Sequence, residues 1–229
     1  MKRLIVSLIF FVTIPFTYAQ QTYVPDDNFE QALIDLFYDD VLNDSVLTAN
    51  ISGVTLLNVS EKEISDLTGI EGFTALSVLW CEYNQLTTLD VSGATVLTSL
   101  FCHANQLTSL DVSANTALTN LLCENNQLTS LDVSSNTALI GMDCGQNQLT
   151  SLDVSSNTSL TTLYCDNNSL TSLDVSANTA LSVLWCANNQ LTYLNMRNGV
   201  TDGLTTFVAT DNSLKAVLLL TSRLVNELL

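Results

Sequence analysis

The amino-acid sequence predicts a right-handed β-solenoid, a coil of short parallel strands stacked along one axis. The first observation is that the six cysteines of the 229-residue chain recur every 21 residues, as from Cys81 to Cys102. Leucines recur at fixed offsets from each cysteine, and side chains around Leu79 and Cys81 alternate as in a strand with one buried face. A period this short indicates a solenoid, because helical-hairpin repeats and propeller blades need about 33 residues or more.

The first element, residues 1–19, has the three parts of a secretory signal peptide. Lys2 and Arg3 form a basic start, residues 4–14 are an apolar run, and Ala19 precedes the expected cleavage site. A membrane anchor would need about 20 apolar residues. We therefore expect an exported protein, secreted or held at the cell surface, with no membrane insertion after cleavage.

Residues 20–53 are expected to form an N-terminal cap that contains an amphipathic helix over residues 26–37. Its apolar residues recur at helical spacing: Phe29, Ala32, Leu33, Leu36 and Phe37. Asp27, followed three residues later by Glu30, resembles a capping box. Such a helix would cover the open core of the first coil, as the end of a solenoid requires. The acidic loop after it, with Asp39, Asp40, Asn43 and Asp44, is expected to be a solvated turn.

The solenoid itself is expected to span residues 54–217. Its unit reads L-x-x-L-x-C-x-x-N-x-L-T-x-L-D-V-S-x-N-T-A, and residues 97–117 are the best copy. The first unit is degenerate, with Val59 at the cysteine position and Lys62 at the asparagine position. The Leu-Asp-Val half of each unit also alternates, which predicts a second parallel sheet on the opposite side.

The last coils depart from the unit. Ala209 and Asn212 occupy the cysteine and asparagine positions of a seventh matching coil, and from Lys215 the pattern is expected to fail. Residues 218–229 are therefore an atypical C-terminal tail, for which two interpretations stand: an amphipathic cap helix, or a truncated or frameshifted end.

These repeats resemble the leucine-rich repeat family, and more narrowly the 21-residue nested repeats of secreted bacterial members. The resemblance covers about residues 54–217, where six units match almost letter for letter. It implies recognition of protein or glycan, adhesion or scaffolding, and not catalysis. Relatives of this kind are commonly exported with a C-terminal sorting domain, and the sequence shows no such domain.

Two repeated positions are expected to be structural ladders, that is, columns of one side chain per coil. The cysteine ladder is Cys81, Cys102, Cys123, Cys144, Cys165 and Cys186. Parallel side chains about 4.8 Å apart do not suit disulfide geometry, so we expect free core thiols. The asparagine ladder is Asn84, Asn105, Asn126, Asn147, Asn168 and Asn189. Buried amides there would satisfy backbone groups left unpaired in tight turns.

A third column is acidic: Asp90, Asp111, Asp132, Asp153 and Asp174, ended by Asn195. Hydrogen bonds from the serine two residues after each aspartate are the expected compensation for the repulsion among these charges. Calcium is the alternative, but it takes six to eight oxygens and one aspartate per coil supplies few. No metal site is therefore predicted.

The position before each cysteine carries the aromatic stripe, defined as Trp80, Phe101, Leu122, Asp143, Tyr164 and Trp185. Strand alternation points it outward, opposite to the leucines and cysteines. The position after each cysteine is rich in charge, and the predicted ligand-binding residues are Trp80, Phe101, Tyr164, Trp185, Glu82, His103, Glu124 and Asp166. Exposed aromatic residues are favoured interface anchors, although pairing across strands to stabilise the sheet is an alternative role.

The net charge of the chain limits the classes of partner that it can bind. Six Lys and Arg residues against 23 Asp and Glu residues give a formal charge of −17, which excludes nucleic acid as a partner. With one histidine and no positioned nucleophile–base pair, we expect no enzyme and no cofactor. The sequence predicts a monomeric, non-catalytic recognition or adhesion module for a protein or glycan ligand. The alternative is a structural or cation-binding rod that uses the Asp column and a Thr column containing Thr129.

Overall fold

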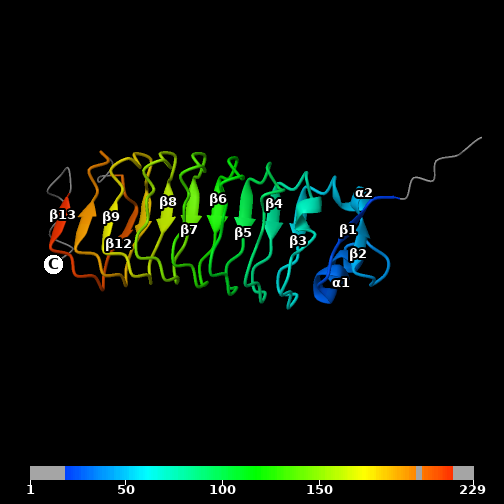
Figure 1. Cartoon of the computed structure of the whole chain (residues 1–229). Coiled ribbons are helices and arrows are strands. Elements are labelled where there is room, and N and C mark those ends of the chain that lie inside the picture. Colours follow the sequence, from blue (N-terminus) through cyan, green and yellow to red (C-terminus); the bar gives the residue numbers. More distant parts are fainter. Residues whose placement is uncertain (1–18, 200–202, 219–229) are drawn as a thin grey trace, which may run out of the picture.

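The computed structural model describes residues 19–199 and 203–218, arranged as one long solenoid with a cap at its N-terminal end (Figure 1). Residues 1–18 of the predicted signal peptide and residues 219–229 of the predicted tail lie outside the described residues. Within the described ranges, no helix combines the length and the apolar composition that crossing a bilayer requires.

The cap consists of a two-stranded antiparallel sheet and two short helices. Strands β1 (Gln21–Tyr23) and β2 (Ser45–Leu47) pair, α1 (Asp27–Asp35) lies between them in the chain, and α2 (Thr48–Ile51) leads into the solenoid. Phe29 of α1 packs against Phe73 of the first coil, with ring centroids 6.4 Å apart. The cap and the coils therefore share one continuous core.

The body of the solenoid is an eight-stranded parallel sheet with one three-residue strand per coil. Its strands are β3 (Leu56–Asn58), β4 (Val78–Trp80), β5 (Ser99–Phe101), β6 (Asn120–Leu122), β7 (Gly141–Asp143), β8 (Thr162–Tyr164), β10 (Val183–Trp185) and β12 (Thr206–Val208). A 3-10 turn, η1 (Ile70–Gly72), lies between β3 and β4. Equivalent repeat positions are paired in register, as Leu79 with Leu100 and Trp80 with Phe101.

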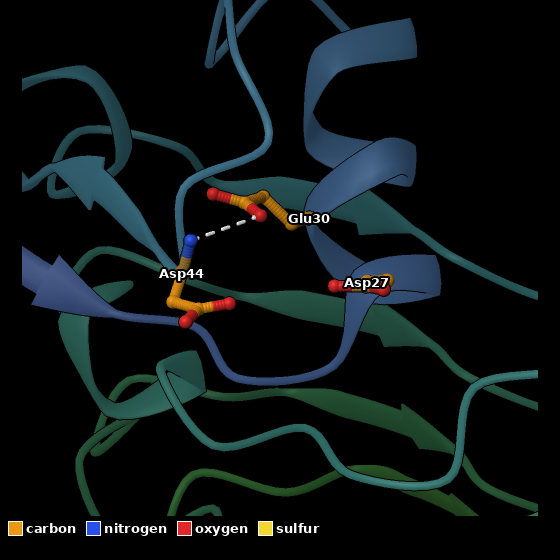
Figure 2. Close-up of side chains that lie close together, drawn as sticks. All are labelled: Asp27, Glu30 and Asp44. Carbon is orange, nitrogen blue, oxygen red and sulfur yellow. Dashed lines mark hydrogen bonds between the residues drawn. The ribbon is translucent and has the colours of Figure 1, made fainter.

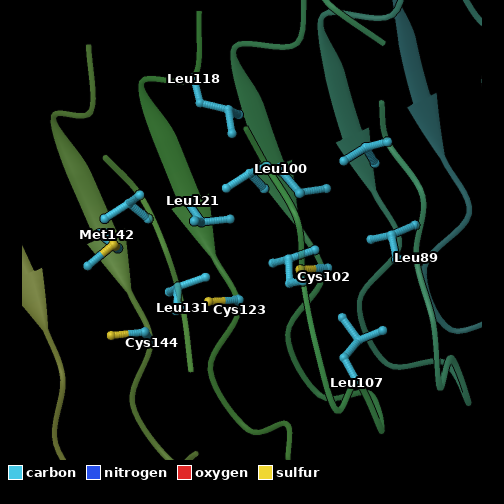
Figure 3. Close-up of a cluster of buried hydrophobic side chains, with 14 of the residues drawn as sticks. Leu89, Leu100, Cys102, Leu107, Leu118, Leu121, Cys123, Leu131, Met142 and Cys144 are labelled. Carbon is cyan, nitrogen blue, oxygen red and sulfur yellow. The ribbon is translucent and has the colours of Figure 1, made fainter. Parts of the chain in front are cut away.

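The interior of the coil is filled by the repeated leucines and cysteines, as Figure 3 shows for Leu100, Cys102, Leu121 and Cys123. All four side chains are fully buried. Each strand thus buries its central residue and turns the residues on either side outward, which is the alternation that the sequence predicts.

A second parallel sheet forms on the Leu-Asp-Val half of the coil, but only in the last coils. It contains β9 (Ser172–Asp174), β11 (Tyr193–Asn195) and β13 (Ala216–Leu218). In the earlier coils, the only isolated bridge in the described residues joins Asp90 to Asp111. The Leu-Asp-Val half of those coils contains no regular strand.

Strand β13 corrects the expectation that the repeat fails from Lys215. Val217 pairs with Leu194, and Leu218 with Asn195, in the register of the preceding coils. The coil around Gly199 has 23 residues in place of the 21 of the regular unit, as the pairing of Leu184 with Phe207 shows. A strict count of 21 residues from Leu194 ends at Lys215 and therefore misses the strand, whereas the longer coil brings Val217 into place.

The predicted helix is shorter at its C-terminal end. Helix α1 ends at Asp35, and Leu36 and Phe37, which were expected on its apolar face, are 38% and 93% exposed. Phe37 has a φ of +63°, in the left-handed region, so the backbone leaves the helix there. Leu36 and Phe37 continue the apolar spacing of the helix, but they are not part of its buried face.

The start of α1 also differs from the prediction, because the N-cap is Asp26 rather than Asp27. One Asp26 carboxylate oxygen accepts the backbone N–H groups of Asn28 and Phe29. The other accepts the backbone N–H and hydroxyl of Ser65 and the N–H of Asp66. Asp26 thus caps the helix and fastens it to the first coil at the same time.

Candidate recognition surface

The aromatic stripe lies on the outward face of the eight-stranded sheet, where the parallel register brings its rings into pairs. Trp80 and Phe101 are stacked, with centroids 5.8 Å apart and planes 6° from parallel. Tyr164 and Trp185 form a tilted pair at 6.2 Å. Trp185 is 39% exposed, and the other three rings are partly exposed. Pairing across strands and an outward aromatic surface therefore occur together.

Asp143 lies between the two aromatic pairs, on β7. Its strand neighbours at the same position are Leu122 and Tyr164. Burial raises the pKa of Asp143 to about 6, and the negative charges of Glu124 and Asp166 add to this, while the N–H of Gly145 donates to Oδ1 at 2.9 Å and opposes it. The centre of the stripe therefore holds a carboxylate in surroundings that disfavour its charge.

The residues that follow the cysteines, beside the aromatic stripe, bring further carboxyl groups to the same face. His103 Nδ1 lies 3.7 Å from Glu124 Oε1, which is too long for a hydrogen bond. The pKa of Glu124 is raised by burial and by the charges of Glu82 and Asp166. Glu82 Oε2, Glu124 Oε2 and His103 Nδ1 are buried atoms without a hydrogen-bond partner within the chain. Tyr83 packs edge-on against the His103 ring at 5.2 Å.

Gly145 is the glycine among the residues that follow the cysteines, and it faces two carboxylates. A Cβ atom at this position would lie 3.1 Å from Asp166 Oδ1 and 3.2 Å from Asp143 Oδ1. These contacts are tight, so the absence of a side chain lets both carboxylates approach the backbone of Gly145. The eight predicted ligand-binding residues thus share one face. Asp143, which belongs to the aromatic stripe but is not among the predicted ligand-binding residues, lies at its centre.

The asparagine ladder is part of the frame behind this face. In the coil of Asn126, Nδ2 donates to the carbonyls of Cys102 and Cys123 at 3.1 Å, and Oδ1 accepts the N–H of Leu107 at 2.9 Å. The same bonds recur along the solenoid as far as Asn212. Each amide therefore joins the turns of two neighbouring coils.

A second asparagine ladder escaped the sequence analysis. It consists of Asn115, Asn136, Asn157 and Asn178, all fully buried. Each Nδ2 donates to two backbone carbonyls, as that of Asn136 does to Val112 and Asn115 at 2.9 Å. The signal was present in the Ser-x-Asn-Thr segment of the unit, where the asparagine recurs in four consecutive units after Ala94 in the first. These residues support the coil and do not reach the outward face.

The six thiols of the cysteine ladder are buried and unpaired. Burial raises the pKa of each thiol; Cys186 reaches about 12. Cys81 Sγ donates to the carbonyl of Phe101 at 3.5 Å. Because the thiolate is the reactive form, thiols held protonated behind the stripe are packing groups.

The Asp column lies on the other half of the coil, away from the stripe. Asp90 Oδ1 accepts the N–H of Ser92 at 2.9 Å, and the hydrogen bonds from Ser92 lower the pKa of Asp90. At the N-terminal end of this column, Asp66, Glu71, Asp90 and Asp111 line a groove of about 620 Å³. The column is thus compensated locally by its serines.

The cap contains a separate group of carboxylates, Asp27, Glu30 and Asp44, drawn in Figure 2. Glu30 was expected to bond back to the start of its own helix, but it is fully buried and accepts the backbone N–H groups of Asn43, Asp44 and Ser45. The acidic loop is therefore anchored to α1 through its backbone, while the side chains of Asp40, Asn43 and Asp44 are exposed, as expected for a solvated turn. With both Glu30 oxygens engaged, the group is a loop anchor.

Comparison with known proteins identifies the relatives of this fold. No protein-family model matches the chain. Internalin J of Listeria monocytogenes is 38% identical over 70 residues, which are 31% of this chain and 8% of that protein. The solved functional domain of the same internalin, described as including a cysteine ladder, is 36% identical with a TM-score of 0.69, over 87% of this chain and 50% of that one.

Two further solved structures share the fold. A leucine-rich repeat protein of Leptospira interrogans is 22% identical with a TM-score of 0.67, over 75% of this chain and 46% of that one. Internalin C2 of Listeria monocytogenes is 21% identical with a TM-score of 0.60, over 86% of this chain and 99% of that one. The leucine-rich repeat resemblance is therefore confirmed: the chain is a leucine-rich repeat solenoid related to internalins, and it spans half of the internalin J domain.

Proposed function

We propose that the chain is a non-catalytic recognition module, secreted or held at the cell surface, that binds a protein or glycan through the outward face of its eight-stranded sheet. The observation that carries this proposal is the pairing of large rings on that face, Trp80 with Phe101 and Tyr164 with Trp185. Paired rings are rigid, so they lose little side-chain entropy when a ligand covers them.

The carboxyl groups of the face support the same interpretation. Asp143 and Glu124 both have a raised pKa, which means that their charges make the folded state less stable at neutral pH. Ionisable groups whose pKa is shifted by burial and by nearby charges are more common at functional sites than elsewhere. The Asp column, by contrast, has lowered pKa values and satisfied oxygens, as Asp90 shows.

The proposed location and partners follow the sequence and the relatives. The predicted signal peptide and the kinship with internalins favour export, and the charge of −17 disfavours nucleic acid. We propose a monomer that acts without a cofactor or metal ion.

The test is to screen the purified chain on protein and glycan arrays and then to compare two variants against the ligand found. Trp185→Ala should weaken binding by about 2 kcal/mol or more, because it removes an exposed anchor ring. Thr129→Ala, on the other half of the coil, should leave the affinity unchanged. Thermal melting of both variants separates lost binding from lost folding.

The opposite pattern would reject the proposal. If Trp185→Ala binds as well as the unaltered chain while substitutions in the Asp column abolish binding, the recognition face lies on the other side of the solenoid. That side carries the Asp and Thr columns, on which the alternative of a structural or cation-binding rod depends, and the groove of about 620 Å³ near Asp90 and Asp111.

A further inference from the structure

We infer that the partner of this face is a basic, extended polypeptide segment that places a lysine or arginine over Asp143 and an apolar side chain on the aromatic pair at each side. The inference rests on the proposed function and names the partner class for the same face. It depends on three features: the negative charge of the face, the wide spacing of its carboxylates and the distance between its aromatic pairs.

The face carries negative charge that no lysine or arginine of the central coils offsets. Between residues 63 and 196 the sequence contains no lysine and no arginine. His103 is the one basic group in that range, and it lies 3.7 Å from Glu124. Asp143 and Asp166 both approach Gly145, and buried oxygens of Glu82 and Glu124 lack hydrogen-bond donors. A cation from a partner would supply the missing positive charge.

A single metal ion does not fit this arrangement. Among the residues that the structure describes, only Asp27, Glu30 and Asp44 bring three potential ligand atoms within 4.8 Å of one another. The carboxylates of the stripe are more widely spread. An ammonium or guanidinium group, with three to five donors on a larger body, can engage carboxylates from two neighbouring coils.

The spacing of the rings selects an extended polypeptide. Phe101 on β5 and Tyr164 on β8 are separated by the strands β6 and β7, which makes three strand intervals. At about 4.8 Å per interval, the two aromatic pairs are about 14 Å apart along the solenoid. An extended segment rises about 3.4 Å per residue, so residues i and i+4 are about 13–14 Å apart and point to the same side.

The residue between them in such a segment, i+2, points to that side as well. It would lie over the midpoint of the two pairs, where Leu122 and Asp143 are adjacent in the sheet. A segment with apolar residues at i and i+4 and a lysine or arginine at i+2 therefore matches the face in both spacing and charge. A neutral glycan offers the rings a surface but brings no cation for the carboxylates.

The experiment measures the affinity of three fluorescent peptides for the full chain by fluorescence polarisation at low salt and pH 7.5. SFSKSFS carries the predicted pattern, SFSESFS reverses the charge, and SFKSSFS moves the lysine by one residue to the opposite side of the segment. We expect SFSKSFS to bind at least tenfold more tightly than either of the others.

Matched variants separate charge from ring contacts. The double variant Glu124→Gln with Asp143→Asn should abolish the preference for lysine over glutamate. The control, Asp132→Asn with Asp153→Asn, removes the same charge from the Asp column and should keep the preference. Trp185→Ala should weaken SFSKSFS and SFSESFS alike. Folding of each variant is checked by circular dichroism.

Acidification gives a second readout on the unaltered chain. Asp143, whose pKa is raised to about 6, should take up a proton between pH 7.5 and pH 5, so the preference for SFSKSFS should fall several-fold. The groups that face it are Glu124 and Asp166 from the adjacent coils, Tyr164 on β8 and, one coil further, His103.

Each outcome decides between the inference and the proposed function. Equal affinity for SFSKSFS and SFSESFS, or a preference that survives the Glu124 and Asp143 substitutions, overturns the inference. Binding of a glycan that depends on Trp185, without binding of SFSKSFS, also overturns it but leaves the recognition face in place. If Trp185→Ala has no effect on any ligand, the proposed function itself fails.

Discussion

At the scale of the residue, Asp143 shows most clearly that the outward face is not arranged for stability. Its Oδ1 atom accepts one hydrogen bond from Gly145, but burial and the charges of Glu124 and Asp166 outweigh that bond and raise its pKa to about 6. The ordinary value in an unfolded chain is near 3.8. Between these two values the folded protein binds more protons than the unfolded one, so its stability falls as the pH rises through this window.

We predict that Asp143→Asn stabilises the protein at neutral pH. The asparagine keeps an oxygen for the Gly145 N–H and removes the unfavourable charge. The pKa shift would correspond to about 3 kcal/mol for a fully buried group, and solvent screening of this partly exposed one reduces the expected gain to about 1–2 kcal/mol at pH 7.5. Most of the gain should disappear at pH 4, where the folded carboxyl group is already protonated. Urea denaturation at both pH values measures it, and an equal gain at both would show that the charge of Asp143 is not its cause.

At the scale of the element, each coil turns through a left-handed residue placed just before the position of the ladder asparagine, which is Lys62 in the first coil and Asn212 in the last. These residues are Glu61, Tyr83, Ala104, Asn125, Gln146, Asn167, Asn188 and Asp211, with φ between 50° and 56°. Four of them are neither glycine, asparagine nor aspartate, so the turn is held in a conformation that their side chains disfavour. The hydrogen bonds of the asparagine ladder, made at the next residue, hold the turn in this shape.

We predict that glycine has opposite effects at two alanines of the same coil. Ala104 has a φ of +52°, so Ala104→Gly relieves backbone strain and should raise the free energy of unfolding by about 0.5–1 kcal/mol. Ala114 does not have a positive φ, so Ala114→Gly adds only freedom to the unfolded chain and should lower it by about 0.5–1 kcal/mol. Denaturant melts of the two variants measure the difference; a loss at both positions would mean that the turn at Ala104 is not strained.

The strands, turns and helix cap show how much of the fold the sequence could predict. The strict recurrence of leucine, cysteine and asparagine was enough for the parallel strands and their register, because stacked coils repeat one environment many times. The left-handed turn was not visible, since residues as different as Tyr83 and Gln146 occupy it. The N-cap was misplaced by one residue because Asp26 and Asp27 are equivalent as sequence signals, and only the contact of Asp26 with Ser65 distinguishes them.

The sequence could predict which residues lie on the candidate face, but not the role of Asp143 at its centre. Alternation was enough to place Trp80 and Trp185 on the same outward face. The role of Asp143 depends on how closely Glu124 and Asp166 approach it from neighbouring coils, and therefore on side-chain packing across three strands. The continuation of the repeat to Val217 depends on the length of a single coil, which places Val217, and not the residue 21 positions after Leu194, beside Leu194.

At the scale of the whole molecule, a formal charge of −17 is distributed along a rod rather than over a compact body. The Asp column adds one carboxylate per coil at a spacing of about 4.8 Å, where neighbouring charges repel by about 1 kcal/mol even in a water-like dielectric. The serine N–H bonds lower the pKa values of this column but leave its charges in place. The serines thus offset the repulsion within this column, but the net charge of −17 on the whole chain still opposes folding at low ionic strength.

We predict that sodium chloride raises the melting temperature and that calcium at equal ionic strength raises it no further. Raising the salt concentration from 0.02 to 0.5 M shortens the Debye length from about 20 Å to about 4 Å, so that repulsion between coils is largely screened. For a chain of this size, about 1–2 kcal/mol recovered in this way corresponds to several degrees. Calcium should act as screening charge alone, because each coil offers one aspartate and one of its oxygens already accepts a serine N–H, as at Asp153. The measurement is a pair of calorimetric melts, in sodium chloride and in calcium chloride matched for ionic strength. An additional rise of several degrees with millimolar calcium would show that the Asp column binds the ion, and would favour the cation-binding rod over a module whose only ligand surface is the aromatic stripe.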